Sequence, residues 1–214
     1  MKTFYLIRHA HSEANGGGIS RPDRLIALSQ TGRRQAEKLA RLLPEPAAIF
    51  CSQLARTAET AAPYAEKWRQ IPQILPQLNE FSCLAYEDVI GLDGTQRRPL
   101  ADAFWQQADP KRRTVASEFT LPDSFADFSQ RVAAFRRLCD SLPDQSVCFT
   151  HGIWLAMLIW QLLGFGCETS ADMRRFRSWQ QKTPMPNTAA FALHTASDGW
   201  AAIRFAPQFC ADKV

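Results

Sequence analysis

The sequence predicts an α/β fold, a three-layer α/β/α sandwich around a mostly parallel central sheet, in a single domain covering residues 1–214. Short apolar runs alternate with longer segments of helical periodicity, the pattern of parallel strands connected by crossover helices. The length suffices for one sizeable core and is small for two. The hydrophobic fraction of 46% and the charged fraction of 21% are those of an ordinary globular domain.

The first part of the chain predicts two strands with a helix between them. Residues 4–7 are a short apolar run, which favours a buried parallel strand. A glycine-rich loop at residues 16–18 follows. Residues 29–43 carry apolar side chains at helical spacing and end before two prolines, so they predict a helix. Residues 47–51 form the second expected strand.

The middle of the chain predicts a helix, an edge strand and an insertion. Residues 53–68 show helical spacing, and Pro63 is expected to kink or divide that helix. Residues 71–75 form a third strand, and the prolines within and after it favour an edge position. Residues 81–121 have weak periodicity and a break at Arg97-Arg98-Pro99, which indicates an inserted, partly helical lid.

The C-terminal part predicts two helices, one strand and a hairpin. Residues 122–142 carry apolar side chains on one face of a long helix, and residues 147–149 form the buried strand after it. Residues 153–163 form a hydrophobic helix. Residues 189–194 and 200–205 predict an antiparallel hairpin with a Ser-Asp-Gly turn between them.

Composition excludes several classes of partner. The 25 Lys and Arg residues exceed the 21 Asp and Glu residues by four, which suits an anionic small molecule without demanding nucleic acid. The apolar start is too short for a signal peptide, and residues 153–165 are too short to span a bilayer. The six cysteines lack metal-site spacing. We therefore expect a cytoplasmic protein with no bound metal and no membrane or nucleic-acid partner.

Arg8 and His9 stand where the first expected strand ends, and they are a candidate nucleophile beside a candidate anion clamp. A neutral imidazole can attack an electrophile, and a guanidinium presents forked donors that match phosphate oxygens. The attacking nitrogen must be unprotonated, so we expect the other ring nitrogen of His9 to donate to a backbone carbonyl. Taken alone, the pair is also compatible with ordinary surface polarity.

Complementary groups follow other expected elements. His151 comes directly after the strand at residues 147–149, and the carboxyl ends of parallel strands meet at the sheet edge where open α/β sheets bind ligands. His9 and His151 therefore converge if their strands are neighbours. Arg56 and Glu80 are the remaining candidates, although an arginine on a helix most often faces water and a single glutamate is most often solvated.

Five ordered motifs span most of the chain. They are Leu6-Ile7-Arg8-His9-Ala10, the segment 28–36, the segment 52–61, Leu78-Asn79-Glu80 and Thr150-His151-Gly152. Together they resemble the histidine phosphatase superfamily, also called the phosphoglycerate mutase-like family. The resemblance implies a metal-independent phosphatase that uses no cofactor and works through a phosphohistidine.

The resemblance also assigns roles to the candidate catalytic residues. His9 is the residue that attacks phosphorus, and Arg8, Arg56 and His151 grip the phosphoryl oxygens. Fixed cationic donors suit this role because a transferring phosphoryl group spreads negative charge over its equatorial oxygens. Glu80, if protonated when substrate binds, donates a proton to the leaving oxygen and later takes one from water.

Four further residues are candidate substrate ligands. Asn15 and Ser12 stand at family-like positions near the phosphate, although both residue types are common in loops for local reasons. Arg97 and Arg98 in the lid are in the place of arginines in mutase lids, where they would bind a carboxylate or second phosphate of the substrate. A solvated lid surface is an equally good interpretation of these two arginines.

Two positions depart from the family pattern. Ala10 replaces the usual glycine, so its backbone must adopt a conformation that tolerates a side chain. His11 replaces a more common polar or acidic residue, and it could add a pH-dependent positive charge at the pocket rim. Neither change removes a group that the chemistry requires.

The loops narrow the reaction expected from the resemblance. A phosphoglycerate mutase would carry a tryptophan-containing loop soon after the first motif, and residues 16–20 contain none, which favours hydrolysis. The shortest family members act on phosphohistidine proteins and largely lack an insert, so the lid favours a small phosphorylated metabolite. We therefore expect a histidine acid phosphatase-like phosphomonoesterase. A mutase-type phosphotransferase and a non-catalytic protein that binds a phosphorylated ligand are the alternatives.

Overall fold

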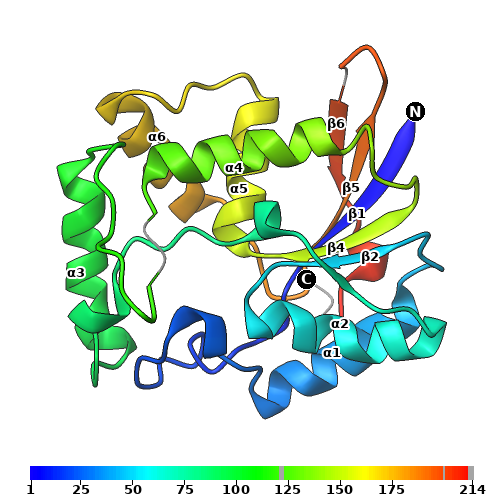
Figure 1. The fold of residues 1–214 in the computed structure, drawn as a ribbon, viewed down its shortest axis with the longest axis horizontal. Coiled ribbons are helices and arrows are strands. Elements are labelled where there is room, and N and C mark those ends of the chain that lie inside the picture. Colours follow the sequence, from blue (N-terminus) through cyan, green and yellow to red (C-terminus); the bar gives the residue numbers. More distant parts are fainter. Residues whose placement is uncertain (121–122, 200, 212–214) are drawn as a thin grey trace.

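A six-stranded sheet forms the centre of the molecule (Figure 1). The structure, a computed structural model, describes residues 1–120, 123–199 and 201–211. The strands are β1 (Lys2–Arg8), β2 (Ile49–Cys51), β3 (Gln73–Ile74), β4 (Ser146–Thr150), β5 (Ala190–Thr195) and β6 (Ala201–Phe205). Their order is β3-β2-β4-β1-β5-β6. The strands β3, β2, β4 and β1 pair in parallel, and the hairpin β5-β6 adds two antiparallel strands at the β1 side.

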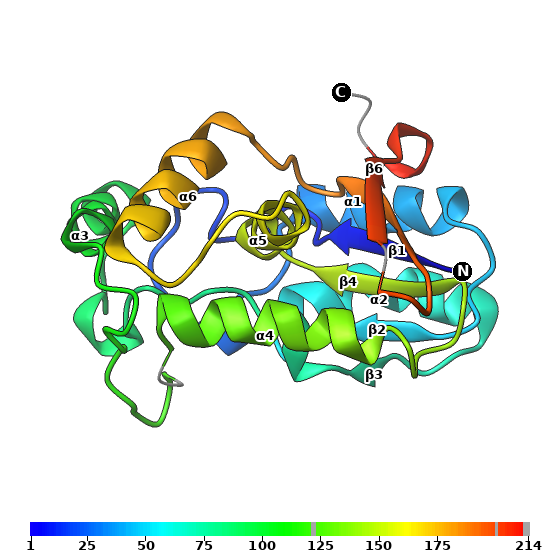
Figure 2. The same cartoon turned by 90° about the horizontal axis from the view of Figure 1, so that it is seen from above.

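Helices cover both faces of the sheet, which confirms the predicted three-layer α/β/α architecture. The α-helices are α1 (Gln30–Leu42), α2 (Ala55–Trp68), α3 (Gly94–Gln107), α4 (Phe125–Leu138), α5 (Gly152–Leu162) and α6 (Ser170–Lys182). The helices α1 and α2 lie on one face, and α4 and α5 lie on the other (Figure 2). Within the described part of the chain, no helix has the length and apolar character needed to cross a membrane.

Alternation along the strands builds a separate core on each face. Ile7 of β1 and Phe149 of β4 belong to the core that contains Leu39 of α1 and Tyr64 of α2. Their neighbours in sequence point the other way and join the larger core, which contains side chains of α4, α5 and α6. Because both faces of these strands are buried, their sequences are continuous apolar runs rather than alternating ones.

The pairing of β1 with β4 positions the two candidate histidines. These strands are parallel neighbours, and Arg8 lies opposite Thr150 in their register. His9 and His151 therefore leave the sheet at the same edge, one residue beyond this pair. The backbone N–H of His9 also donates to the carbonyl of Thr150 at 2.9 Å, which fixes the two chain segments side by side.

Two prolines lie inside helices without ending them. Pro63 was expected to kink or divide its helix, and α2 runs undivided from Ala55 to Trp68. Burial of Ala61 and Tyr64 on either side of Pro63 stabilises the helix more than the missing hydrogen bond destabilises it. Pro99 likewise lies within α3, where a break was expected, after a start capped by the Asp93 side chain.

The remaining differences concern helix ends and one helix that the periodicity did not reveal. The predicted helix 122–142 is shorter as observed, because the Ser124 side chain caps α4 by accepting from Asp127 N–H; residues 121 and 122 lie outside the described residues. The helix α6 was not predicted. It buries only Met173 and Phe176, and its clearest signal is the capping box of Thr169 and Asp172.

An aromatic cluster attaches the lid to the rest of the domain. Phe81 packs against Phe104 and Trp105 of α3 and against Phe128 of α4, with ring centroids 5.2–5.7 Å apart. Trp105 also contacts Phe176 of α6. The lid is therefore a packed part of the structure, and α3 lies beside α6 at the end of the molecule opposite β6 (Figure 1).

We expect Gly32→Ala to destabilise the protein. Gly32 lies in the first turn of α1, and a Cβ atom there would lie 2.0 Å from the carbonyl oxygen of His11. The helix would have to shift, which costs about 1–3 kcal/mol in the free energy of unfolding. Urea denaturation measures this change.

Gly18→Ala is the matched control, because a Cβ atom at Gly18 would meet the carbonyl of Glu13 at an ordinary 3.5 Å. Its free energy of unfolding should change by less than about 0.5 kcal/mol. Equal stability of the two variants would contradict the close contact between α1 and the His11 backbone.

Candidate active site

His9 is buried in the orientation that a nucleophile requires. Its side chain is 5% exposed, and Nδ1 lies 2.7 Å from the carbonyl oxygen of Ala10. A carbonyl only accepts, so Nδ1 carries the proton and Nε2 is left with its lone pair. The expected backbone carbonyl acceptor is confirmed. Burial lowers the pKa of His9 well below its ordinary value, and the charges of Arg56 and Arg8 lower it further.

His151 lies beside His9, as the strand pairing requires. The centroids of the two rings are 5.2 Å apart. Nε2 of His151 is 2.8 Å from Oγ of Ser52, and Nδ1 is buried without a hydrogen-bond partner among the residues that the structure describes. Burial, followed by the charge of Arg56, lowers the pKa of His151 well below its ordinary value. Nδ1 is therefore a free polar atom next to the candidate nucleophile.

Ser52 is a site residue whose role the sequence did not reveal. A serine before a helix is expected to cap it, but α2 begins after Leu54 and has no side-chain cap. The Ser52 hydroxyl instead bonds His151 and Thr57 and accepts from the N–H of Leu54. It therefore holds the imidazole of His151 in place.

Arg8 leaves the end of β1 and lies against the start of α5. A Cβ atom at Gly152 would come within 3.1 Å of Nε of Arg8, so only a glycine lets the guanidinium lie this close to the helix. Nη1 of Arg8 donates to the carbonyl of Met185, while Nε is buried without a partner among the described residues. Burial lowers the pKa of Arg8 from its usual value.

Arg56 reaches the site from the first turn of α2 and is held by an acidic residue that the sequence did not single out. Its side chain is 7% exposed, and Nη1 donates to the carboxylate of Asp23 at 2.8 Å and to the carbonyl of Asp23 at 3.0 Å. Asp23 begins a short 3₁₀ helix, Asp23–Leu25, in the loop after the first motif. The anion clamp thus already holds one carboxylate of its own chain.

Glu80 follows the short 3₁₀ helix Pro76–Leu78 after β3, and its side chain reaches the first turn of α5. Oε1 accepts from the N–H of Phe81 and Oε2 from the N–H of Ile153, both at 3.0 Å. Burial raises the pKa of Glu80 above its ordinary value, and these two N–H groups together with Arg56 and Arg8 offset part of that rise. The net direction favours the protonated acid.

Burial shifts the pKa values of His9 and Glu80 in opposite directions. In water a carboxyl group loses its proton at a lower pH than an imidazolium does, so a neutral histidine and a protonated glutamate do not coexist in quantity. Here desolvation lowers the pKa of His9 and raises that of Glu80, because it disfavours the charged form of each. The site therefore favours an unprotonated nucleophile beside a protonated acid.

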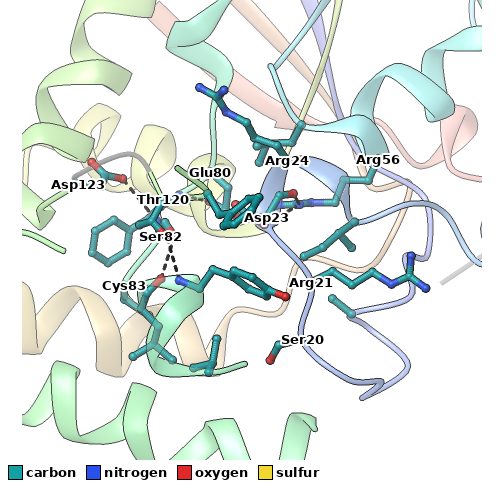
Figure 3. Close-up of a pocket in the computed structure, with 18 of the residues that line it drawn as sticks. Ser20, Arg21, Asp23, Arg24, Arg56, Glu80, Ser82, Cys83, Thr120 and Asp123 are labelled. Atoms are coloured by element: carbon teal, nitrogen blue, oxygen red, sulfur yellow. Dashed lines mark hydrogen bonds and ion pairs between the residues drawn. The ribbon is translucent and has the colours of Figure 1, made fainter. Parts of the chain in front are cut away.

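Two cavities adjoin at these residues. The inner cavity has a volume of about 410 Å³ and is lined by Arg8, His9, Ser12, Asn15, Arg56 and Glu80, among others. The outer cavity has a volume of about 360 Å³ and extends under the lid. Asp23, Arg56 and Glu80 line both cavities, so they lie at the boundary between the two spaces. Figure 3 shows these three side chains in the outer cavity.

The predicted ligands in the first loop lie in the inner cavity. Oδ1 of Asn15 accepts from the N–H and hydroxyl of Ser12 at 3.0 Å each and from Nδ2 of Asn187 at 3.1 Å. Nδ2 of Asn187 also donates to the carbonyl of His9. With its oxygen occupied in this way, Asn15 has its amide nitrogen to offer to a ligand, while Ser12 orients Asn15.

The two lid arginines and His11 are placed differently from the other candidates. Nη1 of Arg97 donates to Gly18 O, Ser20 Oγ and Leu92 O at 2.9 Å each, so this arginine joins the lid to the first loop at the wall of the outer cavity. Arg98 is exposed and lines neither cavity. His11 also lines neither, because its Nδ1 bonds the Ser29 hydroxyl at the start of α1.

Ala10 fits its position without strain. It is fully buried, and its N–H donates to Oγ1 of Thr60 at 3.0 Å. Ala10 is not among the residues with positive φ, so its methyl group is tolerated. Among the residues described, no three His, Cys, Asp or Glu side chains form a group that could hold a metal ion.

Comparison with known proteins places this site in a family. The sequence model of the "Histidine phosphatase superfamily (branch 1)" matches residues 4–206. The adenosylcobalamin/alpha-ribazole phosphatase of Escherichia coli is 30% identical over 79% of this chain and 83% of its own. A probable phosphatase of Schizosaccharomyces pombe is 38% identical over 48% of this chain, and the match spans about half (49%) of that relative.

Solved structures share the fold. A putative alpha-ribazole-5'-P phosphatase from Escherichia coli superimposes with a TM-score of 0.69 at 23% identity, over 95% of each chain. A mycobacterial glucosyl-3-phosphoglycerate phosphatase gives a TM-score of 0.67 at 24% identity, over 96% of this chain and 98% of its own. At these identities the agreement concerns the fold.

We expect Asp23→Asn to tighten the binding of inorganic phosphate. The substitution keeps an oxygen that can accept from Arg56 and removes the negative charge that competes with an anion for the same guanidinium. Isothermal titration calorimetry at low ionic strength should show an affinity about three- to tenfold higher.

Glu66→Gln makes the same charge change at an exposed position of α2, the helix that carries Arg56, and should leave phosphate binding unchanged. Weaker phosphate binding by Asp23→Asn would contradict the competition, and would mean that the charge of Asp23 holds Arg56 in its binding orientation.

Proposed function

The chain belongs to the histidine phosphatase superfamily, branch 1, and phosphatases are among its matching relatives; we propose that it hydrolyses a small phosphate monoester through a phosphohistidine on His9. The observation that supports this most is the pairing of a neutral His9 with a Glu80 whose burial favours its protonated form. The inner cavity that holds both groups also contains Arg8 and Arg56. A dianionic phosphoryl group would be held there by fixed cationic donors.

In the first half-reaction, Nε2 of His9 attacks phosphorus and forms a P–N bond. The bond from phosphorus to the ester oxygen breaks, and that oxygen takes the proton from Glu80 as it leaves as an alcohol. Arg8 and Arg56 stabilise the charge on the equatorial oxygens. His151 donates to the same oxygens from Nδ1, which requires its proton on Nδ1 and the Ser52 hydroxyl donating to Nε2.

In the second half-reaction, water replaces the alcohol. Glu80 is now ionised, and it takes a proton from the water whose oxygen attacks phosphorus. The P–N bond breaks, the electron pair returns to Nε2 of His9, and inorganic phosphate leaves. Glu80 is again protonated and His9 is again neutral, so one carboxyl group serves both steps.

The substrate class follows from the dimensions of the site. The two adjoining cavities of about 410 and 360 Å³ are of the size that holds a small molecule. Asn15 in the inner cavity supplies an additional donor for the phosphate. Arg98 is not part of this proposal, because its side chain lies outside both cavities.

Steady-state release of inorganic phosphate tests the function. We expect the protein to release phosphate from small monoesters at the same rate with and without a chelator, and to release one alcohol per phosphate. Transfer of the phosphate to a second hydroxyl with little free phosphate would instead indicate a mutase. Tight binding of monoesters with no turnover would indicate a phosphate-binding protein.

The pH profile tests the roles of His9 and Glu80. The value of kcat/KM should rise as His9 loses its proton, below the ordinary pKa of histidine, and fall where Glu80 ionises, above the ordinary pKa of a carboxyl group. Glu80→Gln should lower kcat by about 100- to 10,000-fold and remove the basic limb. The phosphate group of the substrate also ionises near pH 6, and this changes kcat/KM equally for the unaltered protein and for Glu80→Gln. A basic limb that survives in Glu80→Gln would contradict the role of Glu80.

A further inference from the structure

The outer cavity lies where the leaving group of a bound monoester would extend. It opens from the inner cavity at Asp23, Arg56 and Glu80, so an ester oxygen next to Glu80 points its substituent into this space. Figure 3 shows Asp23 and Arg56 turned toward each other at this boundary, with Ser82 and Cys83 of the lid across the cavity. The side chains that form its walls therefore determine which leaving groups the protein can bind.

Apolar side chains form the walls of the outer cavity from three directions. The first loop supplies Ile19 and Ile26, and Leu54 comes from the residue before α2. The lid supplies most of the large apolar residues, which are Phe81, Leu84, Tyr86, Val89 and Phe119. Two of the wall residues are substantially exposed, Ile19 at 62% and Phe119 at 42%, so their apolar surface is available to a ligand.

The aromatic wall is fixed by the lid itself. Tyr86 and Phe119 meet edge to face with ring centroids 5.6 Å apart. The N–H of Tyr86 donates to Oγ1 of Thr120 at 2.8 Å, and the Thr120 hydroxyl donates to the carboxylate of Glu87 at 2.9 Å. These bonds hold residues 86–87 and 119–120 together, so the pair of rings is a built feature of the cavity.

Three of the arginines around the outer cavity are paired with carboxylates. Arg131 donates to both carboxylate oxygens of Asp123 at 2.9 and 3.0 Å, and Arg56 is paired with Asp23. Arg21 pairs with Glu13 at 3.4 Å. Figure 3 shows the guanidinium groups of Arg21 and Arg24 pointing away from the centre of the cavity.

Arg97 is likewise committed, since its Nη1 donates to three oxygens of the first loop and the lid. A carboxylate or a second phosphate in the outer cavity would therefore have to break an existing ion pair or hydrogen bond to bind any of these four paired arginines. Arg24, which has no such partner among the described residues, would have to turn inward from the position that Figure 3 shows.

We propose that the outer cavity binds an uncharged leaving group with an apolar, ring-containing body, held against Tyr86 and Phe119. This inference rests on the proposed phosphatase function and specifies its substrate class. An aromatic or alicyclic alcohol fits the apolar walls and leaves the ion pairs intact. The alcohol oxygen remains at Glu80, so the two half-reactions are unchanged.

Three primary alkyl phosphates test this proposal: ethyl phosphate, 2-phenylethyl phosphate and 3-phosphopropanoate. The leaving group of each ester is a primary alcohol, so the three differ little in chemical reactivity. Differences in kcat/KM therefore report mainly how the outer cavity binds each leaving group. We expect kcat/KM for 2-phenylethyl phosphate to exceed that for ethyl phosphate by about 10- to 100-fold, the effect of burying one phenyl ring. The value for 3-phosphopropanoate, whose leaving group carries a carboxylate, should not exceed that for ethyl phosphate.

Phe119→Ala and Tyr86→Ala should each lower the ratio of the 2-phenylethyl to the ethyl value by about five- to tenfold. The ratio is measured on one preparation, so partial unfolding of a variant does not change it. Phe205→Ala is the matched control, because Phe205 is 41% exposed, pairs edge to face with Phe191 at 5.4 Å, and lies on β6 outside both cavities. Its ratio should equal that of the unaltered protein.

Equal kcat/KM values for ethyl and 2-phenylethyl phosphate would overturn the inference and leave the phosphatase function standing. A preference for 3-phosphopropanoate, or a phenyl preference that persists in both lid variants, would overturn it in the same way. Absence of phosphate release from all three esters would contradict the proposed function itself, and the inference with it.

Discussion

The parallel pairing of β1 with β4 at the centre of the sheet is the constraint on which the rest of the site depends. It sets Arg8 opposite Thr150, so His9 and His151 leave the same edge and their rings lie 5.2 Å apart. The helix that follows β4 then places Gly152 against the Arg8 guanidinium and the N–H of Ile153 against Glu80. Open α/β sheets bind ligands at this edge because loops from neighbouring strands meet there.

Burial sets the protonation states that the arrangement favours. The same desolvation that lowers the pKa of His9 raises that of Glu80, so both groups are driven toward their neutral forms. The arginines keep their charge, and each is already bonded: Arg8 to the Met185 carbonyl and Arg56 to Asp23. Such fixed donors need little reorganisation when a phosphoryl group arrives, which is the condition for electrostatic stabilisation of a transition state. On the other side of Asp23, most of the arginines of the outer cavity are already bonded, and large apolar side chains form much of its wall.

Local sequence patterns predicted those helices and strands whose buried faces require apolar residues at a regular spacing. The apolar runs of β1 and β4 and the motifs at Arg8-His9 and His151 located the edge of the sheet, while the spacing of α1 and α4 located helices within a few residues. The contacts between distant segments were not predictable in this way. Asp23 reaches Arg56 across 33 positions, and Ser52 reaches His151 across 99. The helix around Pro63 persists because tertiary packing outweighs local preference.

The central claim, that His9 carries the phosphoryl group, is tested most directly by trapping. The protein is mixed briefly with 4-nitrophenyl phosphate labelled at phosphorus, quenched at alkaline pH and digested for peptide mapping. The account predicts a label that is stable in alkali, labile in acid and confined to the peptide containing His9, and absent from His9→Ala. An acid-stable label, or the same label on His9→Ala, would contradict it.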